Sequence, residues 1–152
     1  SIATESLTES GELQNYLDKI RTSSFDLFKR GKSEEAIALI QKEIVEKKYA
    51  KDNDFSALGD IYLFNKQFVK AEEQYKKAID KNSSELLYQL KLAHVFMFSN
   101  KVGQAKDIHK LYKDNNVSSS KSWVAQTKFD FEDFEKRGFP TDNFKKILRI
   151  LE

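Results

Sequence analysis

The 152-residue chain is long enough for one compact domain or one short array of repeats. One Pro, five Gly and 33% charged residues are typical of a helical soluble protein, and no apolar run approaches the roughly 20 residues of a membrane-spanning helix. The absence of Cys excludes disulfides and thiolate metal sites, and a net charge of +2 is too small to attract nucleic acid or a membrane by bulk charge.

The N-terminal third predicts a polar start and then one pair of helices. Residues 1–10 are mostly Ser, Thr and Glu, so we expect a disordered or frayed N-terminus followed by a single domain over residues 11–152. A helix is predicted over residues 12–29. We expect Ser33 to cap the next helix, because two glutamates follow it at the end where the helix dipole favours negative charge.

The next stretch, residues 53–84, has the clearest helix–turn–helix pattern in the chain. Leu58 and Tyr62 share one face at helical spacing, with Gly59 among the apolar residues. Glycine inside a helix costs up to about 1 kcal/mol relative to alanine, so Gly59 predicts the close approach of a second helix. After a short turn the helical period resumes from Phe68, with Ala71 as its small residue.

A third pair of helices is predicted from the stretch that follows. Residues 85–98 are apolar almost all round, which indicates a helix buried on several sides, and residues 103–113 supply its partner. Residues 115–120 are rich in Asn and Ser and form the clearest linker in the chain.

The C-terminal stretch predicts a fourth pair. Ser120 or Ser122 can cap a helix over residues 123–136, and Gly138 with Pro140 ends that helix. The last helix carries an apolar stripe that is suited to covering the final open core of a repeat array.

Three sets of positions recur with one period of 34 or 35 residues. The first set holds small residues, the second bulky apolar residues, and the third alanines. The sets are Ser24, Gly59, Ala93 and Thr127; Leu27, Tyr62 and Phe96; and Ala36, Ala71 and Ala105. We therefore predict four helix hairpins, over residues about 17–51, 52–85, 86–119 and, in degenerate form, 120–152.

The second hairpin carries Leu58-Gly59, Tyr62, Ala71, Tyr75 and Ala78 in that order. This order resembles the pattern of the tetratricopeptide repeat (TPR) family, which recurs about every 34 residues. The other copies match it less fully: in the first, Ile40 and Glu43 replace the aromatic residue and the last alanine, and in the fourth Asp130 replaces the aromatic residue. The resemblance implies an all-α fold, a right-handed α-solenoid of about four antiparallel hairpins with the last helix capping the array. It also implies a non-enzymatic scaffold whose first helices line a concave groove for a protein or peptide partner.

The hairpin register places the candidate partner-binding residues on the second and third hairpins. Phe64 and Phe98 hold equivalent places, 34 residues apart, and would form apolar pockets suited to an extended or helical peptide. The alternative is that both rings seal contacts between neighbouring hairpins. Polar residues between the rings would pair with a peptide, or else form solvated groups or an internal ion pair. The full predicted set is Asn53, Asp60, Phe64, Lys91, His94, Met97 and Phe98.

The sequence does not predict an enzyme. Only His94 and His109 could act as imidazole bases, and they do not have the one-turn spacing of a helical metal pair. His109 falls at a hairpin packing position, so we expect it to be buried. We predict no catalytic, cofactor-binding or metal-binding residues, no cofactor and no small-molecule substrate.

Two other functions stay open at this point. The exposed ends of a short array and the apolar third hairpin would suit a homodimer or another homo-oligomer. Helical repeats can also read RNA, although Asp60 and Glu132 accompany Lys91 and Lys128 on the predicted groove and weaken that interpretation. A cytoplasmic location is expected, and a removed signal peptide stays open because the sequence begins at Ser1.

Overall fold

The computed structural model describes the backbone of residues 2–152 and the side chains of residues 10–152. Over this part, eight α-helices and one π-helical turn make up the regular structure, apart from one small β-hairpin, so the predicted all-α class is confirmed. The first helix, α1 (Ile2–Lys29), begins before the expected residue 12. The disordered or frayed N-terminus predicted over residues 1–10 stays a prediction, since Ser1 and the side chains of residues 2–9 lie outside the described residues.

The helices follow one another in packed pairs. The first three pairs are α1 with α2 (Ser33–Ile40) and its π-helical extension η1 (Gln41–Val45), α3 (Asp52–Phe64) with α4 (Phe68–Lys81), and α5 (Leu86–Phe98) with α6 (Val102–Tyr112). A β-hairpin of β1 (Asn116–Ser118) and β2 (Lys121–Ser122) then leads into α7 (Trp123–Lys136) and α8 (Phe144–Leu151). α8 packs against α6.

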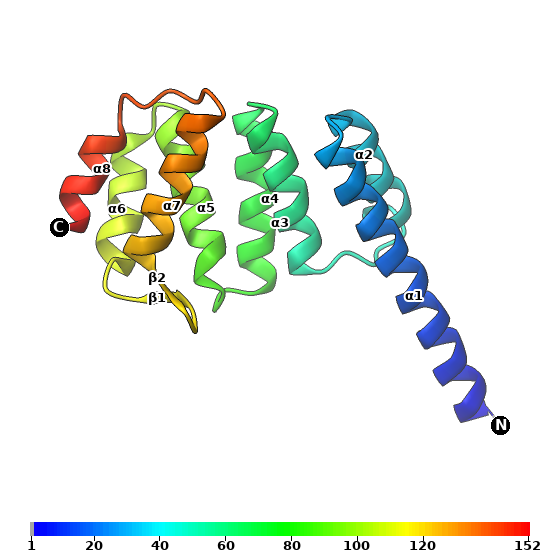
Figure 1. The fold of residues 1–152 in the computed structure, drawn as a ribbon. Helices are drawn as coiled ribbons and strands as arrows, with labels where there is room; N and C mark the ends of the chain where they lie inside the picture. Colours follow the sequence, from blue (N-terminus) through cyan, green and yellow to red (C-terminus); the bar gives the residue numbers. More distant parts are fainter. Residues whose placement is uncertain (1) are drawn as a thin grey trace.

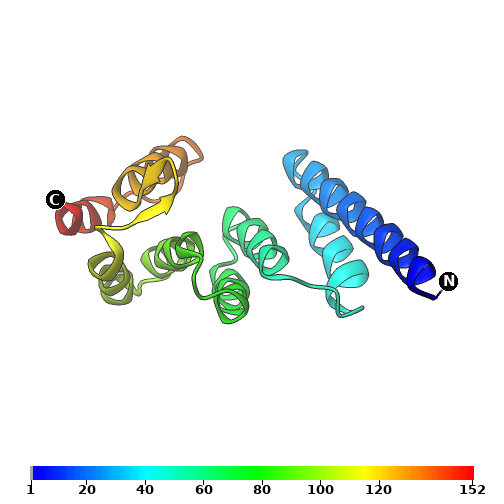
Figure 2. The ribbon, with the colours of Figure 1, turned by 90° about the horizontal axis from the view of Figure 1, so that it is seen from below.

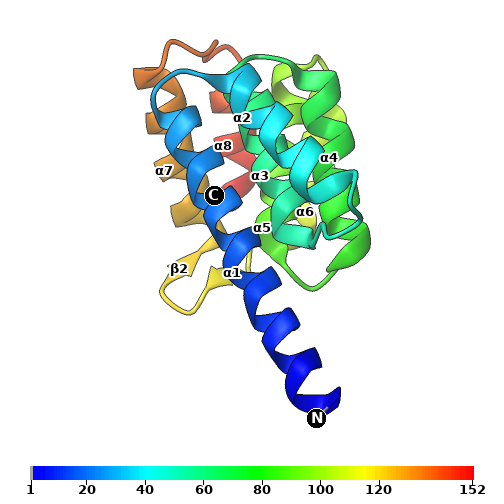
Figure 3. The ribbon, with the colours of Figure 1, turned by 90° about the vertical axis from the view of Figure 1, so that its right-hand side faces the viewer.

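The pairs stand side by side in a curved row (Figures 1 and 2). Figure 2 shows α1 and α7 facing each other across the inner side of the curve, with α3 and α5 between them. The N-terminal end of α1 extends past the other helices (Figure 3). Within the described residues, no helix combines the length and the apolar character needed to cross a bilayer.

The repeating small residues lie where the paired helices touch. Ser24 and Ala36 are buried, and the Ser24 hydroxyl donates to the Ala36 carbonyl oxygen at 3.1 Å. Gly59 lies directly against the ring of Tyr75 from α4: an added Cβ would come within 2.4 Å of Tyr75 Cε1. The predicted close approach at Gly59 is therefore confirmed.

The π-helical turn η1 accounts for the longer spacing of the first repeat. Ala36 lies 35 residues before Ala71, but Ile44 lies 34 residues before Ala78. A π-turn accommodates one more residue than an α-turn, so the extra residue is taken up in η1. Ile44 is fully buried, as Ala78 is, whereas Glu43 is only partly buried. Ile44, and not Glu43, thus holds the place of the last alanine.

The fourth pair starts and ends largely as predicted. The Ser122 hydroxyl accepts a hydrogen bond from the Ala125 N–H at 3.0 Å, so Ser122 caps α7. Gly138 follows the end of α7 with a φ of +80°, which glycine adopts without strain. The expected linker at residues 115–120 contains β1. The cap predicted at Ser33 is wrong: α2 begins at Ser33 itself, and its N-cap residue makes no side-chain cap hydrogen bond.

Candidate peptide-binding groove

The inner side of the row contains two adjoining pockets that share Asp60. The first, which we call the apolar pocket, has a volume of about 100 Å³ and lies between α1, α2 and α3. The second, which we call the acidic pocket, has a volume of about 110 Å³ and lies between α3, α5 and α7. We call the two together the inner groove. The apolar pocket is lined mainly by Phe25, Phe28, Ile40, Ala57 and Ile61, and the acidic pocket by Asp60, Phe64, Lys91, His94, Asp130, Asp133 and Phe134.

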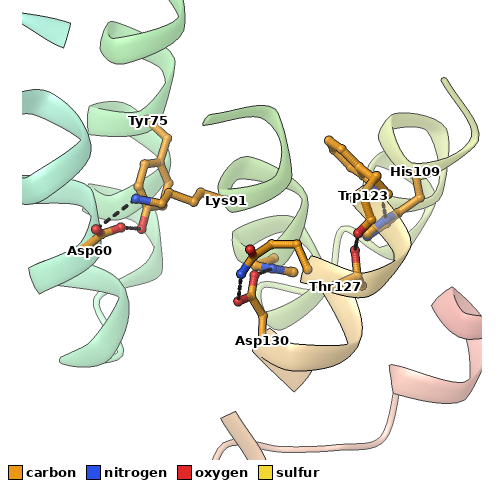
Figure 4. Close-up of polar contacts among 9 residues, drawn as sticks. Asp60, Tyr75, Lys91, His109, Trp123, Thr127 and Asp130 are labelled. Carbon is orange, nitrogen blue, oxygen red and sulfur yellow. Dashed lines mark hydrogen bonds and ion pairs between the residues drawn. The ribbon is translucent and has the colours of Figure 1, made fainter. Parts of the chain in front are cut away.

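Asp60 stands at the junction of the two pockets and joins three helices (Figure 4). Its Oδ1 accepts a hydrogen bond from the buried Tyr75 hydroxyl of α4 at 2.6 Å. Its Oδ2 lies 3.0 Å from the Lys91 Nζ of α5, which also donates to Ser56 Oγ at 3.0 Å. Burial, together with the Asp60 carboxylate, raises the pKa of Tyr75 well above its usual value, so its hydroxyl stays a donor.

The wall formed by α1 is fixed by an ion pair to α3. Arg21 donates from Nε and Nη2 to the two carboxylate oxygens of Asp54, at 2.8 and 2.9 Å. The Asp54 side chain is only 3% exposed and also accepts from the Lys51 N–H at 2.9 Å, at the start of α3. Hydrogen bonding to Asp54 raises the pKa of Arg21, so the guanidinium remains charged. A buried, two-point contact of this kind holds α1 in place beside α3.

The wall formed by α7 presents two carboxylates. Asp130 accepts from His94 Nε2 at 2.9 Å and from Gln126 Nε2 at 2.8 Å. Asp133 accepts from Arg137 Nε at 2.9 Å. The Arg137 guanidinium lies over the Phe64 ring, 4.5 Å from its centroid, which joins the end of α7 to α3.

Beyond this wall, His109 is buried as predicted and takes part in a structural hydrogen bond. Trp123 Nε1–H donates to His109 Nδ1 at 2.9 Å, which places the proton of the neutral ring on Nε2 (Figure 4). Burial, with a smaller effect of His94, lowers the pKa of His109 to about 3. Within the part of the chain that the structure describes, no group of three or more His, Asp or Glu residues is placed to hold a metal ion.

The two predicted aromatic residues lie in contacts within the chain. Phe64 and Phe98 belong to a set of rings that we call the aromatic cluster, with centroid separations of 4.9 to 6.1 Å. Phe98 packs edge-on against Phe134 at 4.9 Å, and Phe64 lies 6.1 Å from the same ring. These contacts agree with the alternative that both rings seal the contacts between neighbouring hairpins. The aromatic cluster comprises Phe28, Phe64, Phe98, Phe134 and Phe139.

The remaining predicted residues divide between the groove and other places. Asp60, Lys91 and His94 meet at the acidic pocket, together with Phe64. His94 and Met97 are each only 2% exposed, so in this arrangement neither presents its side chain to a partner, and we leave both out of the binding surface. Asn53 is exposed near the start of α3 and lines neither pocket.

The predicted set of binding residues left out the residues that the outer two hairpins contribute to the groove. Phe25 lines the apolar pocket and is 57% exposed, and Arg21 one turn earlier lines the same pocket. Asp130 and Asp133 line the acidic pocket from α7. The register does place Arg21 and Phe25 on the inner side of α1, although they were not chosen as binding residues. On the fourth hairpin the register places Lys128 and Glu132 on the predicted groove, whereas the structure brings Asp130 and Asp133 there and leaves Lys128 and Glu132 outside both pockets.

No protein-family model, curated protein or solved structure matches the chain. The function is therefore inferred from the inner groove itself.

Proposed function

We propose that the chain is a non-enzymatic protein-interaction scaffold that binds a partner peptide or helix in the inner groove. The proposal includes a TPR-like arrangement, a right-handed α-solenoid of four hairpins. Two features support that arrangement. The small residues recur at 34 or 35 residues and lie at contacts between paired helices, and the first helix of each pair faces the inner side of the row.

The observation that carries the binding proposal is that the two pockets are neighbours and share a lining residue, Asp60. They meet at Asp60, so one ligand segment can enter both. The apolar pocket has room for one large apolar side chain, and the acidic pocket offers carboxylate oxygens and the Lys91 ammonium beside it. An apolar anchor with nearby polar contacts is how grooves of helical proteins hold a peptide.

Phe25 marks the edge of the apolar pocket that solvent reaches. Its ring is 57% exposed, although it lines a pocket whose other members are mostly buried or partly buried. A ligand side chain in the pocket would cover this ring and remove apolar surface from water, at about 25 cal/mol per Å². Phe25 is therefore the residue whose loss should weaken binding with the smallest effect on the fold.

The experiment begins with selection of a phage-displayed library of random 12-residue peptides on the purified chain. Enriched peptides are then titrated by fluorescence anisotropy against the wild type, Phe25→Ala and Phe129→Ala. Phe129 is a matched control, because it is also 57% exposed but lines neither pocket. We expect Phe25→Ala to weaken binding about tenfold and Phe129→Ala to leave it unchanged.

Equal binding by both variants would contradict the proposed site. Light scattering at several protein concentrations completes the test. A mass that rises with concentration would favour the homo-oligomer alternative, whereas a constant monomer mass supports a scaffold that binds other chains.

A further inference from the structure

We infer that the segment bound in the inner groove is basic, and that it places a large apolar side chain in the apolar pocket and an arginine or lysine in the acidic pocket. This inference rests on the proposed function and specifies the chemistry of the partner.

The charge of the groove is opposite in sign to that of the chain. Among the residues that line its two pockets, four are carboxylates and two are cations, whereas the chain carries a net charge of +2. The imbalance does not follow from the composition of the chain, which has more cations than carboxylates. The carboxylates are Asp54, Asp60, Asp130 and Asp133, and the cations are Arg21 and Lys91.

Among the described residues, each positively charged side chain at the groove already contacts a carboxylate. Arg21 is held by Asp54 and Lys91 by Asp60, and Arg137 at the rim is held by Asp133. An acidic ligand would therefore have to separate an existing ion pair before it gained a partner. Such a separation leaves a partly buried charge without its counterion, which opposes binding.

Asp130 is the carboxylate best placed to receive a ligand cation. Its two side-chain partners are the His94 ring at 2.9 Å and the Gln126 amide at 2.8 Å, and no lysine or arginine among the described residues pairs with it. Asp60 and Asp133 line the same pocket from α3 and α7. A guanidinium group that enters between these two helices can donate to carboxylate oxygens on both walls, and its planar fork suits such two-point contacts.

The spacing of the pockets fixes the spacing of the two ligand groups. On α3, Ala57 and Ile61 line the apolar pocket, and Leu63 and Phe64 line the acidic pocket, with Asp60 common to both. Along α3 the pockets are thus offset by about one helical turn, or roughly 5 Å, and they lie on different sides of this helix, toward α1 and α2 and toward α5 and α7. A helical ligand can reach both with an apolar residue and a long basic residue three or four positions apart.

The phage selection also tests this inference, through the charge and sequence of the enriched peptides. We expect peptides with Arg or Lys three or four residues from Leu, Ile, Met or Phe, and an affinity that falls as salt is raised from 50 to 500 mM. For one enriched peptide, the version with Glu in place of Arg should bind at least about tenfold more weakly.

A pair of variants on α7 supplies the matched comparison on the protein side. Asp130→Asn keeps the shape of the side chain and removes its charge, so it should weaken the basic peptide about fivefold. Glu132→Gln removes a charge two residues away, from a side chain that lines neither pocket, and should leave affinity unchanged.

The outcomes separate the two proposals. Enriched peptides that are neutral or acidic, but lose binding in Phe25→Ala, would overturn the basic partner and leave the inner groove as the binding site. Peptides that bind equally to the wild type and Phe25→Ala, or no enrichment at all, would overturn the proposed function and this inference with it.

Discussion

Replacing Gly59 by alanine tests how tightly the second helix pair is packed. The new Cβ would lie 2.4 Å from Tyr75 Cε1 and 2.6 Å from Cδ1, closer than real Cβ atoms approach a ring. Tyr75 is fully buried and its hydroxyl is held by Asp60, so the ring can yield only by straining the core or lengthening that hydrogen bond. Overpacking costs about 1–3 kcal/mol and a weakened hydrogen bond to a charged group about 1.5–3 kcal/mol, against at most about 1 kcal/mol gained from helix propensity.

Where both costs apply, we therefore expect a net loss of about 1.5–5 kcal/mol, which for a domain of this size lowers the melting temperature by roughly 3–20 °C. Urea unfolding followed by circular dichroism measures the change, with Gly103→Ala as the control. A Cβ on Gly103 of α6 would meet nothing within 4 Å, so that variant should be neutral or more stable. If the two variants have the same stability, the close contact between Gly59 and Tyr75 does not exist in solution.

Three further predictions follow from the buried groups. Burial lowers the pKa of His109 to about 3, below its unfolded value near 6.5, so the unfolded chain binds the extra proton between these pH values. The free energy of unfolding should therefore decrease as pH is lowered from about 6.5 to 3, by up to about 1.4 kcal/mol per pH unit from this group. Urea unfolding of His109→Phe at several pH values should show a smaller decrease. Arg21→Ala leaves the Asp54 carboxylate buried without its cation and should cost about 3–5 kcal/mol, whereas Lys47→Ala breaks an exposed pair and should cost less than about 1 kcal/mol, both by urea unfolding. Phe98→Ala should cost about 3–5 kcal/mol by thermal melting, and an unchanged melting temperature would show that the ring is free to act as a ligand anchor.

The sequence predicted the helices well because their constraints are local. The spacing of Gly59, Ala71 and their equivalents records where helices touch, and the cap at Ser122 and the stop at Gly138 are set by single residues. The turn η1 was not predicted, although the one-residue excess in the first repeat was its signature. No side-chain pattern marks a π-turn, since it is forced by the packing of the residues on either side.

The candidate site was less predictable, for a different physical reason. Helical register placed Asp60 and Lys91 correctly on one surface, because both lie on neighbouring helices of adjacent pairs. The part played by Asp130 depends on how strongly the row curves, which brings α7 round to face α3. Curvature is the sum of many small packing angles, and a repeat period does not encode it.

The aromatic cluster has a consequence for how the chain unfolds. Where each repeat touches only its neighbours, stability is a sum of local terms and the array can melt from an end. Here Phe64 in the second pair contacts Phe134 and Phe139 of the fourth pair, and Phe28 of the first pair contacts Phe64. Loss of α7 would thus weaken pairs that lie well back along the chain. We expect α3 and α7 to exchange their amide hydrogens with similar protection, as parts of one cooperative unit.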